Sequence, residues 1–215
     1  SEKDFMRLVE RFRIKSKEKI IGFLNSIHSG TLGSVDENGF PQLIPMNFVY
    51  ANEAIYMHSH RVGEKIDNIR RNSKVGFEAH KHVEFLPSYF FDPEDACSAD
   101  TLYISVVVKG LASLVEDLEE KANALNSLME KYQKEGYYKR LSRDMSGVKH
   151  VTIIKVKPIT MTGKYKLGQQ WSKEYRRYIA SKILERGSPT AKESVALMGF
   201  NPCTLEYIHE PDFVP

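Results

Sequence analysis

Hydrophobic and polar positions change their period several times along the chain, and each change marks a different kind of element. Apolar residues at helical spacing predict a helix over about 17–27. Two strand-like runs follow at 30–36 and 40–50, and the Asn-Gly pair between them is typical of a hairpin turn. Two prolines in the second run predict a strand that lies at a sheet edge or carries a bulge. A third run at 54–59 completes a three-stranded meander.

The remaining elements follow the same two periods. Apolar residues spaced three and four apart indicate helices, and alternating or β-branched runs indicate strands. In chain order, the pattern predicts a helix at 61–71, strands at 74–80 and 101–117, a helix at 118–132, a strand at 150–165, and helices at about 171–186 and 190–198.

These elements add up to a mainly β protein with helices. About six strands that begin with a meander favour an antiparallel barrel decorated by helices over a parallel βαβ sheet. The length of 215 residues suits one domain with an appendage. We therefore expect a charged N-terminal arm at 1–15, a barrel domain at 16–167 and a helical C-terminal extension at 168–215.

Composition excludes several broad classes of protein. Hydrophobic residues make up 41% and charged residues 27% of the chain, an ordinary balance for a protein with a packed core. The net charge of +3 is small for a dedicated nucleic-acid-binding protein. The two cysteines lie far apart, which suits a reducing, cytoplasmic environment. The apolar runs are strand-sized, so no membrane span is expected. Motifs of P-loop, Rossmann, zincin and α/β-hydrolase proteins do not occur.

The densest candidate chemistry lies in residues 55–75. A strand ends at His58 and Ser59, a turn with Gly63 follows, and Lys65 stands in the first turns of the next helix. A helix N-terminus exposes backbone N–H groups and a partial positive charge. A serine hydroxyl and a lysine ammonium at the same point would complete a phosphate site. A solvated strand–helix unit explains the same residues, so the local pattern leaves both interpretations open.

Several segments, taken in order, resemble the FMN-binding split-barrel family related to pyridoxamine 5′-phosphate oxidase, and within it the branch of nitroimidazole-resistance proteins. The resemblance covers roughly residues 20–165 and rests on the order and spacing of the segments. It implies a six-stranded antiparallel split β-barrel that forms a homodimer, with one FMN in each of two clefts at the subunit interface. The matching segments are GTLGSVDENGFPQLIPMNFVY at 30–50, IYMHSHRVGEKIDNIRRNSKVGFE at 55–78, YISVVVKGLASLVED with EEKANALNSLMEKY at 103–132, and VTIIKVKPITMTGK at 151–164.

The resemblance also implies positions for the cofactor. The stretch at 45–48 resembles the strand whose backbone borders the isoalloxazine ring. His58 and Ser59 resemble the strand end beside the flavin phosphate and ribityl chain, Lys65 the phosphate-binding lysine, and Ser105 a polar position next to the cofactor. Trp171 in the C-terminal extension is a candidate to stack on a flavin across the dimer, or else a packing anchor. The cofactor-binding candidates are Pro45, Met46, Asn47, Phe48, His58, Ser59, Lys65, Ser105 and Trp171.

The activity implied is electron transfer from reduced nicotinamide through FMN to a small organic acceptor such as a nitro compound. His58 is the candidate proton donor or substrate contact, and so the candidate catalytic residue. The Arg-rich C-terminal signature of pyridoxamine phosphate oxidases is missing, so that substrate is not expected. Two alternatives stay open: a flavin-binding barrel without turnover, and a haem-binding barrel. The C-terminal extension is expected to pack on the barrel or on the partner subunit.

Two further patterns are rivals of the flavin site. His58 with His60, and His80 with His82, place pairs of imidazoles on one strand face, as a zinc or iron site requires. The resemblance assigns His58 to the flavin cleft, and we predict no metal site. Aromatic and basic residues alternate at 171–178, a mixture that can stack bases and bind phosphates. A solvated helix face is the commoner explanation, and we predict no nucleic-acid partner.

Overall fold

The computed structural model describes residues 2–215, and only the backbone of residues 4, 5, 7 and 8. The first residue of the predicted arm at 1–15 lies outside the described residues, and the rest of that arm includes α1 (Glu2–Arg11). The chain divides into two compact units. The first unit contains the chain up to Lys19, His80–Ser105 and Gly163–Pro215, and the second contains Ile20–Ala79 and Val106–Thr162.

The described chain is mainly β with helices, as the sequence predicts. Its strands form one sheet in the order β2-β1-β5-β6-β7-β4-β3, in which β1 pairs antiparallel with β2 and β5, and β4 pairs antiparallel with β3 and β7. The strands are β1 (Gly30–Val35), β2 (Pro41–Met46), β3 (Val49–Ala51), β4 (Ala54–Ser59), β5 (Lys74–Leu86), β6 (Asp100–Leu114) and β7 (Thr152–Lys166).

The number of strands corrects the prediction from six to seven. The run at 40–50, predicted as one strand, is two strands, β2 and β3, separated by Asn47 and Phe48. These strands lie at opposite ends of the sheet order. The position of β2 at a sheet edge confirms the interpretation of its two prolines, because proline cannot donate a hydrogen bond to a neighbouring strand.

The short link between β2 and β3 requires the sheet to curl. Three residue steps separate Met46 from Val49, and they span at most about 11 Å. Seven strands laid flat would hold the two edges about 29 Å apart. The sheet therefore curls, and the chain passes from one edge strand to the other at Asn47 and Phe48. We call these two residues the seam.

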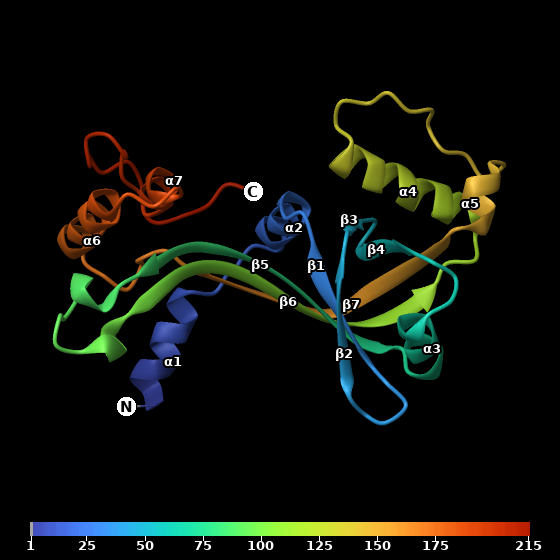
Figure 1. Ribbon diagram of the computed structural model, residues 1–215, viewed down its shortest axis with the longest axis horizontal. Coiled ribbons are helices and arrows are strands. Elements are labelled where there is room, and N and C mark those ends of the chain that lie inside the picture. Colours follow the sequence, from blue (N-terminus) through green and yellow to red (C-terminus); the bar gives the residue numbers. More distant parts are fainter. Residues whose placement is uncertain (1) are drawn as a thin grey trace. The chain divides into compact units, whose positions relative to one another are not determined.

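Three helices agree with the sequence pattern: α2 (Lys17–Ser26), which lies in the second unit from Ile20 onward, and α3 (Glu64–Arg71) and α4 (Leu118–Tyr132) within that unit. The short helix α5 (Ser146–His150) also belongs to this unit. Helix α4 begins after Asp117, whose carboxylate accepts the backbone N–H of Glu119 at 2.9 Å. It lies over β3 and β4 (Figure 1). The buried contact between them consists of Val49, Ala54, Tyr56, Ala124, Leu128 and Ile153.

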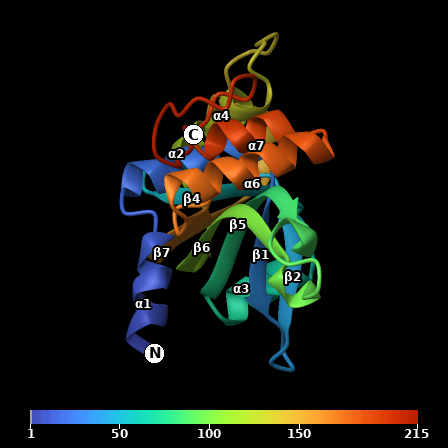
Figure 2. The same cartoon turned by 90° about the vertical axis from the view of Figure 1, so that its left-hand side faces the viewer.

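The C-terminal extension is helical, as predicted, with α6 (Lys173–Arg186) and α7 (Ala191–Leu197) lying side by side (Figure 2). A buried carboxylate attaches this segment to β5 of the same unit. Glu84 accepts hydrogen bonds from Ser188 at 2.7 Å, from Thr190 at 2.9 Å and from Ser194 at 2.7 Å. Three hydroxyl donors satisfy a carboxylate that has little access to water.

Candidate functional site

Four of the predicted cofactor residues lie in the seam or directly before it, and they differ in exposure. Pro45 and Asn47 are exposed, Met46 is half-buried, and Phe48 is fully buried. Phe48 packs edge-on against Phe77, with ring centroids 4.7 Å apart. The chain therefore points one aromatic ring into the core and leaves the Asn47 amide at the surface, where a ligand can reach it.

The backbone of Phe48 is held by side chains instead of by a neighbouring strand. Its N–H donates to the Tyr132 hydroxyl at 2.9 Å, and its carbonyl oxygen accepts from the Lys131 ammonium at 2.8 Å. Both side chains come from the last turn of α4. The Tyr132 hydroxyl also lies 2.6 Å from the carbonyl oxygen of His28. The C-terminal end of α4 thus supplies the hydrogen bonds that strand pairing would supply elsewhere.

A third side chain, that of Asn25, binds the backbone of β3 in the same way. The Asn25 amide donates to the Tyr50 carbonyl at 3.0 Å and accepts the Tyr50 N–H at 2.8 Å. Asn25 lies in the last turn of α2. One amide side chain thereby satisfies both polar groups of a residue on an edge strand, because it carries a donor and an acceptor side by side.

Lys131 is the most perturbed cation of this region. Its ammonium lies 3.7 Å from the centre of the Phe48 ring and donates to the Leu24 carbonyl at 3.2 Å, in the last turn of α2. Burial lowers the pKa of this amine from 10.5 to about 8. The aromatic face and the negative end of α2 favour the charged form. The group is therefore mainly protonated at neutral pH.

Neither Lys131 nor Asn25 is predicted from the sequence. A lysine in the last turn of an amphipathic helix is typical of a solvated cation near the helix dipole, and an asparagine near a helix end is typical of a cap. Only the approach of both helix ends to the seam makes them half-buried groups that hold its backbone.

His58 and Ser59 end β4, as expected from the sequence. His58 is the exposed residue of a strand that is otherwise buried, and Ser59 is 8% exposed. The Ser59 hydroxyl donates to the carbonyl oxygen of His60 at 2.9 Å. His58 therefore presents an imidazole to the surface, and Ser59 must rotate its hydroxyl before it can bind an anion.

Helix α3 carries Lys65, half-buried in its first turn. Gly63 before the helix has a φ of 139°, a left-handed conformation that favours glycine. Asn68 is 1% exposed and donates to Ser34 at 3.1 Å, which fixes α3 on β1. A pocket of about 350 Å³ beside the helix is acidic, and Lys65 does not line it. Its lining residues are Asp36, Glu37, Asn38, Gly63, Glu64, Asp67, Asn68 and Arg71.

The acidic residues of that pocket restrict where the predicted phosphate could bind. Its carboxylates, two of them in the first turn of α3, repel an anion placed there. A phosphate that reaches this helix must therefore bind on the side of Lys65 and not within the pocket.

The other two predicted cofactor residues belong to the first unit. Ser105 is half-buried on β6, and Trp171 is half-buried before α6. The Trp171 ring packs against Phe91 at 5.7 Å and against Tyr175 at 5.8 Å between centroids. These contacts account for Trp171 as a packing anchor within its unit. Its role as a flavin contact stays a prediction.

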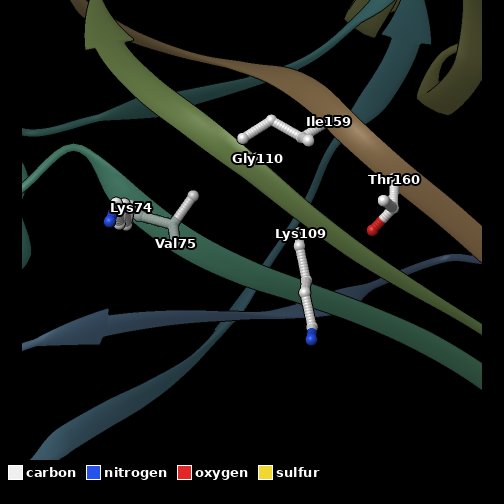
Figure 3. Close-up of a pocket in the computed structure, with 6 residues that line it drawn as sticks. All are labelled: Lys74, Val75, Lys109, Gly110, Ile159 and Thr160. Atoms are coloured by element: carbon white, nitrogen blue, oxygen red, sulfur yellow. The ribbon is translucent and has the colours of Figure 1, made fainter.

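A pocket of about 330 Å³ lies on the outer face of β5, β6 and β7 in the second unit (Figure 3). Lys74 and Lys109 carry ammonium groups at its rim, and Ile159 is 66% exposed. Along β6 the buried and exposed positions alternate, so Val107 and Leu111 also face outward, 45% and 41% exposed. None of the predicted cofactor residues lines this pocket.

Among the described residues, no cluster of metal-ligand side chains supports the alternative metal interpretation. In residues 2–215, no three histidine, cysteine, aspartate or glutamate side chains lie together in a way that could hold a metal ion. His58, His60, His80 and His82 are each exposed. Within the same residues, no helix is both long and apolar enough to cross a membrane.

The described residues thus form a curled antiparallel sheet of seven strands accompanied by helices. A family model described as pyridoxamine 5′-phosphate oxidase matches residues 16–165. The chain therefore belongs to this family, and the resemblance noted in the sequence is confirmed. No curated protein matches the chain.

Solved structures extend the comparison. A candidate 5-nitroimidazole antibiotic resistance protein from Bacteroides thetaiotaomicron is 30% identical, with a TM-score of 0.59, over 71% of this chain and 85% of that chain. An FAD and heme binding protein from Mycobacterium smegmatis is 12% identical, with a TM-score of 0.62, over 82% and 80%. The flavocytochrome Anf3 from Azotobacter vinelandii is 16% identical, with a TM-score of 0.59, over 72% and 69%. The last two share the fold.

Proposed function

We propose that this protein binds FMN and is an oxidoreductase that passes electrons from reduced nicotinamide to a small organic acceptor such as a nitro compound. Membership of the pyridoxamine 5′-phosphate oxidase family over residues 16–165 carries the proposal. The 30% identity to a candidate nitroimidazole-resistance protein supports a nitro compound as the acceptor. Flavoproteins among the structures of the same fold support a flavin as the cofactor.

The residues of the second unit fit such a cofactor. A flavin needs hydrogen-bonding groups at the pyrimidine edge of its ring, an apolar wall, and a cation for its phosphate. The exposed Asn47 amide and the adjoining backbone would serve the ring edge, and Met46 would serve the wall. Lys65 would hold the phosphate, with Ser59 after rotation of its hydroxyl. When bound, the flavin supplies the redox chemistry.

His58 would act on the acceptor. Its imidazole is exposed at the end of β4, and the ring nitrogens of histidine can donate and accept hydrogen bonds. It can therefore hold a proton at the surface of the barrel and donate it to a reduced acceptor.

We propose in addition that the protein is a homodimer and that the outward face of β6 and β7 is part of its interface. Val107 and Leu111 on β6 and Ile159 on β7 expose aliphatic side chains on neighbouring strands, and Ile159 lines the pocket of Figure 3. Exposed aliphatic side chains grouped on neighbouring strands, here with Lys109 between Val107 and Leu111, suit a surface that a partner covers. A second copy fits because the family resemblance implies a dimer with its cofactors at the interface.

The first experiment is the absorption spectrum of the purified protein, with chromatography of any chromophore released by heat. Oxidised flavin bands and released FMN support the proposal. A colourless protein that also takes up no added FMN contradicts it. Steady-state oxidation of reduced nicotinamide that depends on FMN and on a nitroaromatic acceptor then distinguishes the enzyme from a flavin-binding barrel without turnover. A Soret band on titration with haem favours the haem-binding alternative.

Sedimentation velocity tests the dimer. The wild-type protein is expected to sediment with the mass of two chains, and Leu111→Lys is expected to shift it toward one chain, because a charge cannot be buried unpaired. Ile208→Lys is the matched control, since Ile208 is an exposed aliphatic residue outside this face. A wild-type monomer, or equal behaviour of the two variants, contradicts the proposed interface.

A further inference from the structure

The first unit contains a pocket that the proposed function does not use. It has a volume of about 410 Å³, which lies within the range of small-ligand sites. It is formed by the 3₁₀ turn at Ser88–Phe90 and the C-terminal half of α6. Its lining residues are Tyr89, Phe90, Tyr178, Lys182, Glu185 and Arg186.

Two tyrosine rings of this pocket are open to solvent. Tyr178 is 45% exposed and Tyr89 is 58% exposed. The spacing on α6 explains the first, because Tyr178 shares a face with Lys182 and Glu185 while the opposite face packs inward. The inward residues of α6 are Arg176, Ile179, Ala180 and Ile183. Large aromatic rings are thus held outside the core of the unit.

The ring of Tyr178 ends a row of aromatic contacts. It stacks on Tyr175 with centroids 6.0 Å apart and planes at 28°, and Tyr175 meets Trp171 edge-on at 5.8 Å. Trp171 in turn packs against Phe91. Tyr178 is the member of this row that lines the pocket. A flat ring placed in the pocket would therefore lengthen an existing row of aromatic contacts.

The charged residues of the pocket complement an anion. The Lys182 ammonium is paired with Glu185 at 2.9 Å, which neutralises part of its charge. Arg186 donates one hydrogen bond, to the Phe85 carbonyl at 3.3 Å. A guanidinium has five N–H donors in a planar fork that fits phosphate and carboxylate oxygens. Arg186 is therefore held in place by a neutral partner, and no carboxylate of the described residues forms an ion pair with its guanidinium.

We propose that this pocket binds a flat aromatic ring that carries an anionic group, as a mononucleotide does. The ring lies against Tyr178 and Tyr89, and the anion binds the guanidinium of Arg186. This site goes beyond the proposed function, whose seam residues belong to the second unit.

Isothermal titration of the purified full-length protein, saturated with FMN where it binds FMN, tests the proposal. The ligands are adenosine 5′-phosphate, which has ring and anion, adenosine, which has the ring alone, and inorganic phosphate. Adenosine 5′-phosphate is expected to bind at least about tenfold more tightly than either of the others. Tyr178→Ala and Arg186→Gln are each expected to weaken its binding about tenfold or more.

The controls separate this pocket from other sites. Tyr137→Ala and Lys192→Gln remove an exposed ring and an exposed charge outside the pocket, and both are expected to leave binding unchanged. Circular dichroism of each variant shows that it is folded. Failure to bind adenosine 5′-phosphate at about 10 mM overturns the proposal. Three other results also overturn it: displacement of FMN by adenosine 5′-phosphate, equal affinities for adenosine and adenosine 5′-phosphate, and a Tyr178→Ala variant whose sedimentation changes while its affinity for the nucleotide does not.

The outcomes for this pocket and for the flavin are independent. A protein that takes up no FMN contradicts the proposed function, and the nucleotide titration can still be carried out on it. A protein that binds FMN but no adenosine 5′-phosphate contradicts the second site alone.

Discussion

Replacement of Lys131 by methionine removes the cation at the seam and keeps an unbranched side chain of similar length. The Leu24 carbonyl loses the Lys131 donor, at about 1–3 kcal/mol when buried, whereas the Phe48 carbonyl keeps the Tyr132 hydroxyl at 3.0 Å. The contact with the Phe48 ring adds about 0.5–2 kcal/mol. Removal of the ammonium also removes the cost of its partial burial, which offsets a share of this loss. The expected net decrease in the free energy of unfolding is about 2 kcal/mol.

Urea denaturation of both proteins measures this difference, with Lys134→Met as the matched control. Lys134 is exposed one turn further along the chain, and its replacement is expected to change stability by less than about 0.5 kcal/mol. Equal midpoints for wild type and Lys131→Met would show that the cation contributes nothing to closure of the seam. An equal loss in the Lys134→Met control would show a general effect of charge.

The pH dependence of stability shows whether burial of the Lys131 ammonium or its contacts with the carbonyls and the ring has the larger effect. In the folded protein the pKa of this amine is about 8, below the ordinary value of 10.5. Between these two values the unfolded chain binds more protons than the folded chain, so stability from this group rises with pH. The gap between wild type and Lys131→Met is therefore expected to widen from about pH 8 to pH 10.5. A gap that narrows would mean that the carbonyls and the ring outweigh burial.

Three further predictions test other parts of the protein. Lys65→Ala is expected to weaken FMN binding by about 1.5–3 kcal/mol, measured by fluorescence titration, and unchanged affinity would refute its role at the phosphate. Glu84→Ala is expected to lower the free energy of unfolding by about 2–4 kcal/mol and to speed amide exchange at 188–194, because three hydroxyls lose their acceptor. Gly110→Ala is expected to destabilise by about 1–3 kcal/mol in thermal melts, since its Cβ would lie 2.7 Å from a β7 carbonyl, whereas Gly147→Ala has open space and is expected to be tolerated.

Much of the fold can be predicted from the sequence because apolar residues in its helices and strands keep the spacing typical of each kind of element. The helices α2, α3, α4 and α6 lie close to their predicted positions, and the prolines of β2 indicate its place at an edge. The break at Asn47 and Phe48 does not follow, because the apolar pattern continues through it. Nothing in a local window indicates that the chain leaves one sheet edge and joins the other.

Some residues of the candidate site can likewise be predicted from the sequence, and others cannot. His58, Ser59 and Lys65 are found from a strand–turn–helix pattern and from the family resemblance, and the structure places them at the end of β4 and on α3. Lys131 and Asn25 are recognised only after folding, since their burial arises where two helix ends meet a segment far away in the chain. Residues that act through tertiary placement carry no local pattern.

The way the seam is closed has a consequence for its dynamics and its evolution. A strand ladder opens only when many backbone bonds break together, but Phe48 and Tyr50 are secured by the side chains of Asn25, Lys131 and Tyr132. Amide exchange at these two positions can therefore report a local opening that is decoupled from global unfolding. Single substitutions of these three side chains can change how often the segment from Phe48 to Tyr50 detaches from the helix ends that hold it. The register of the strand pairs need not change.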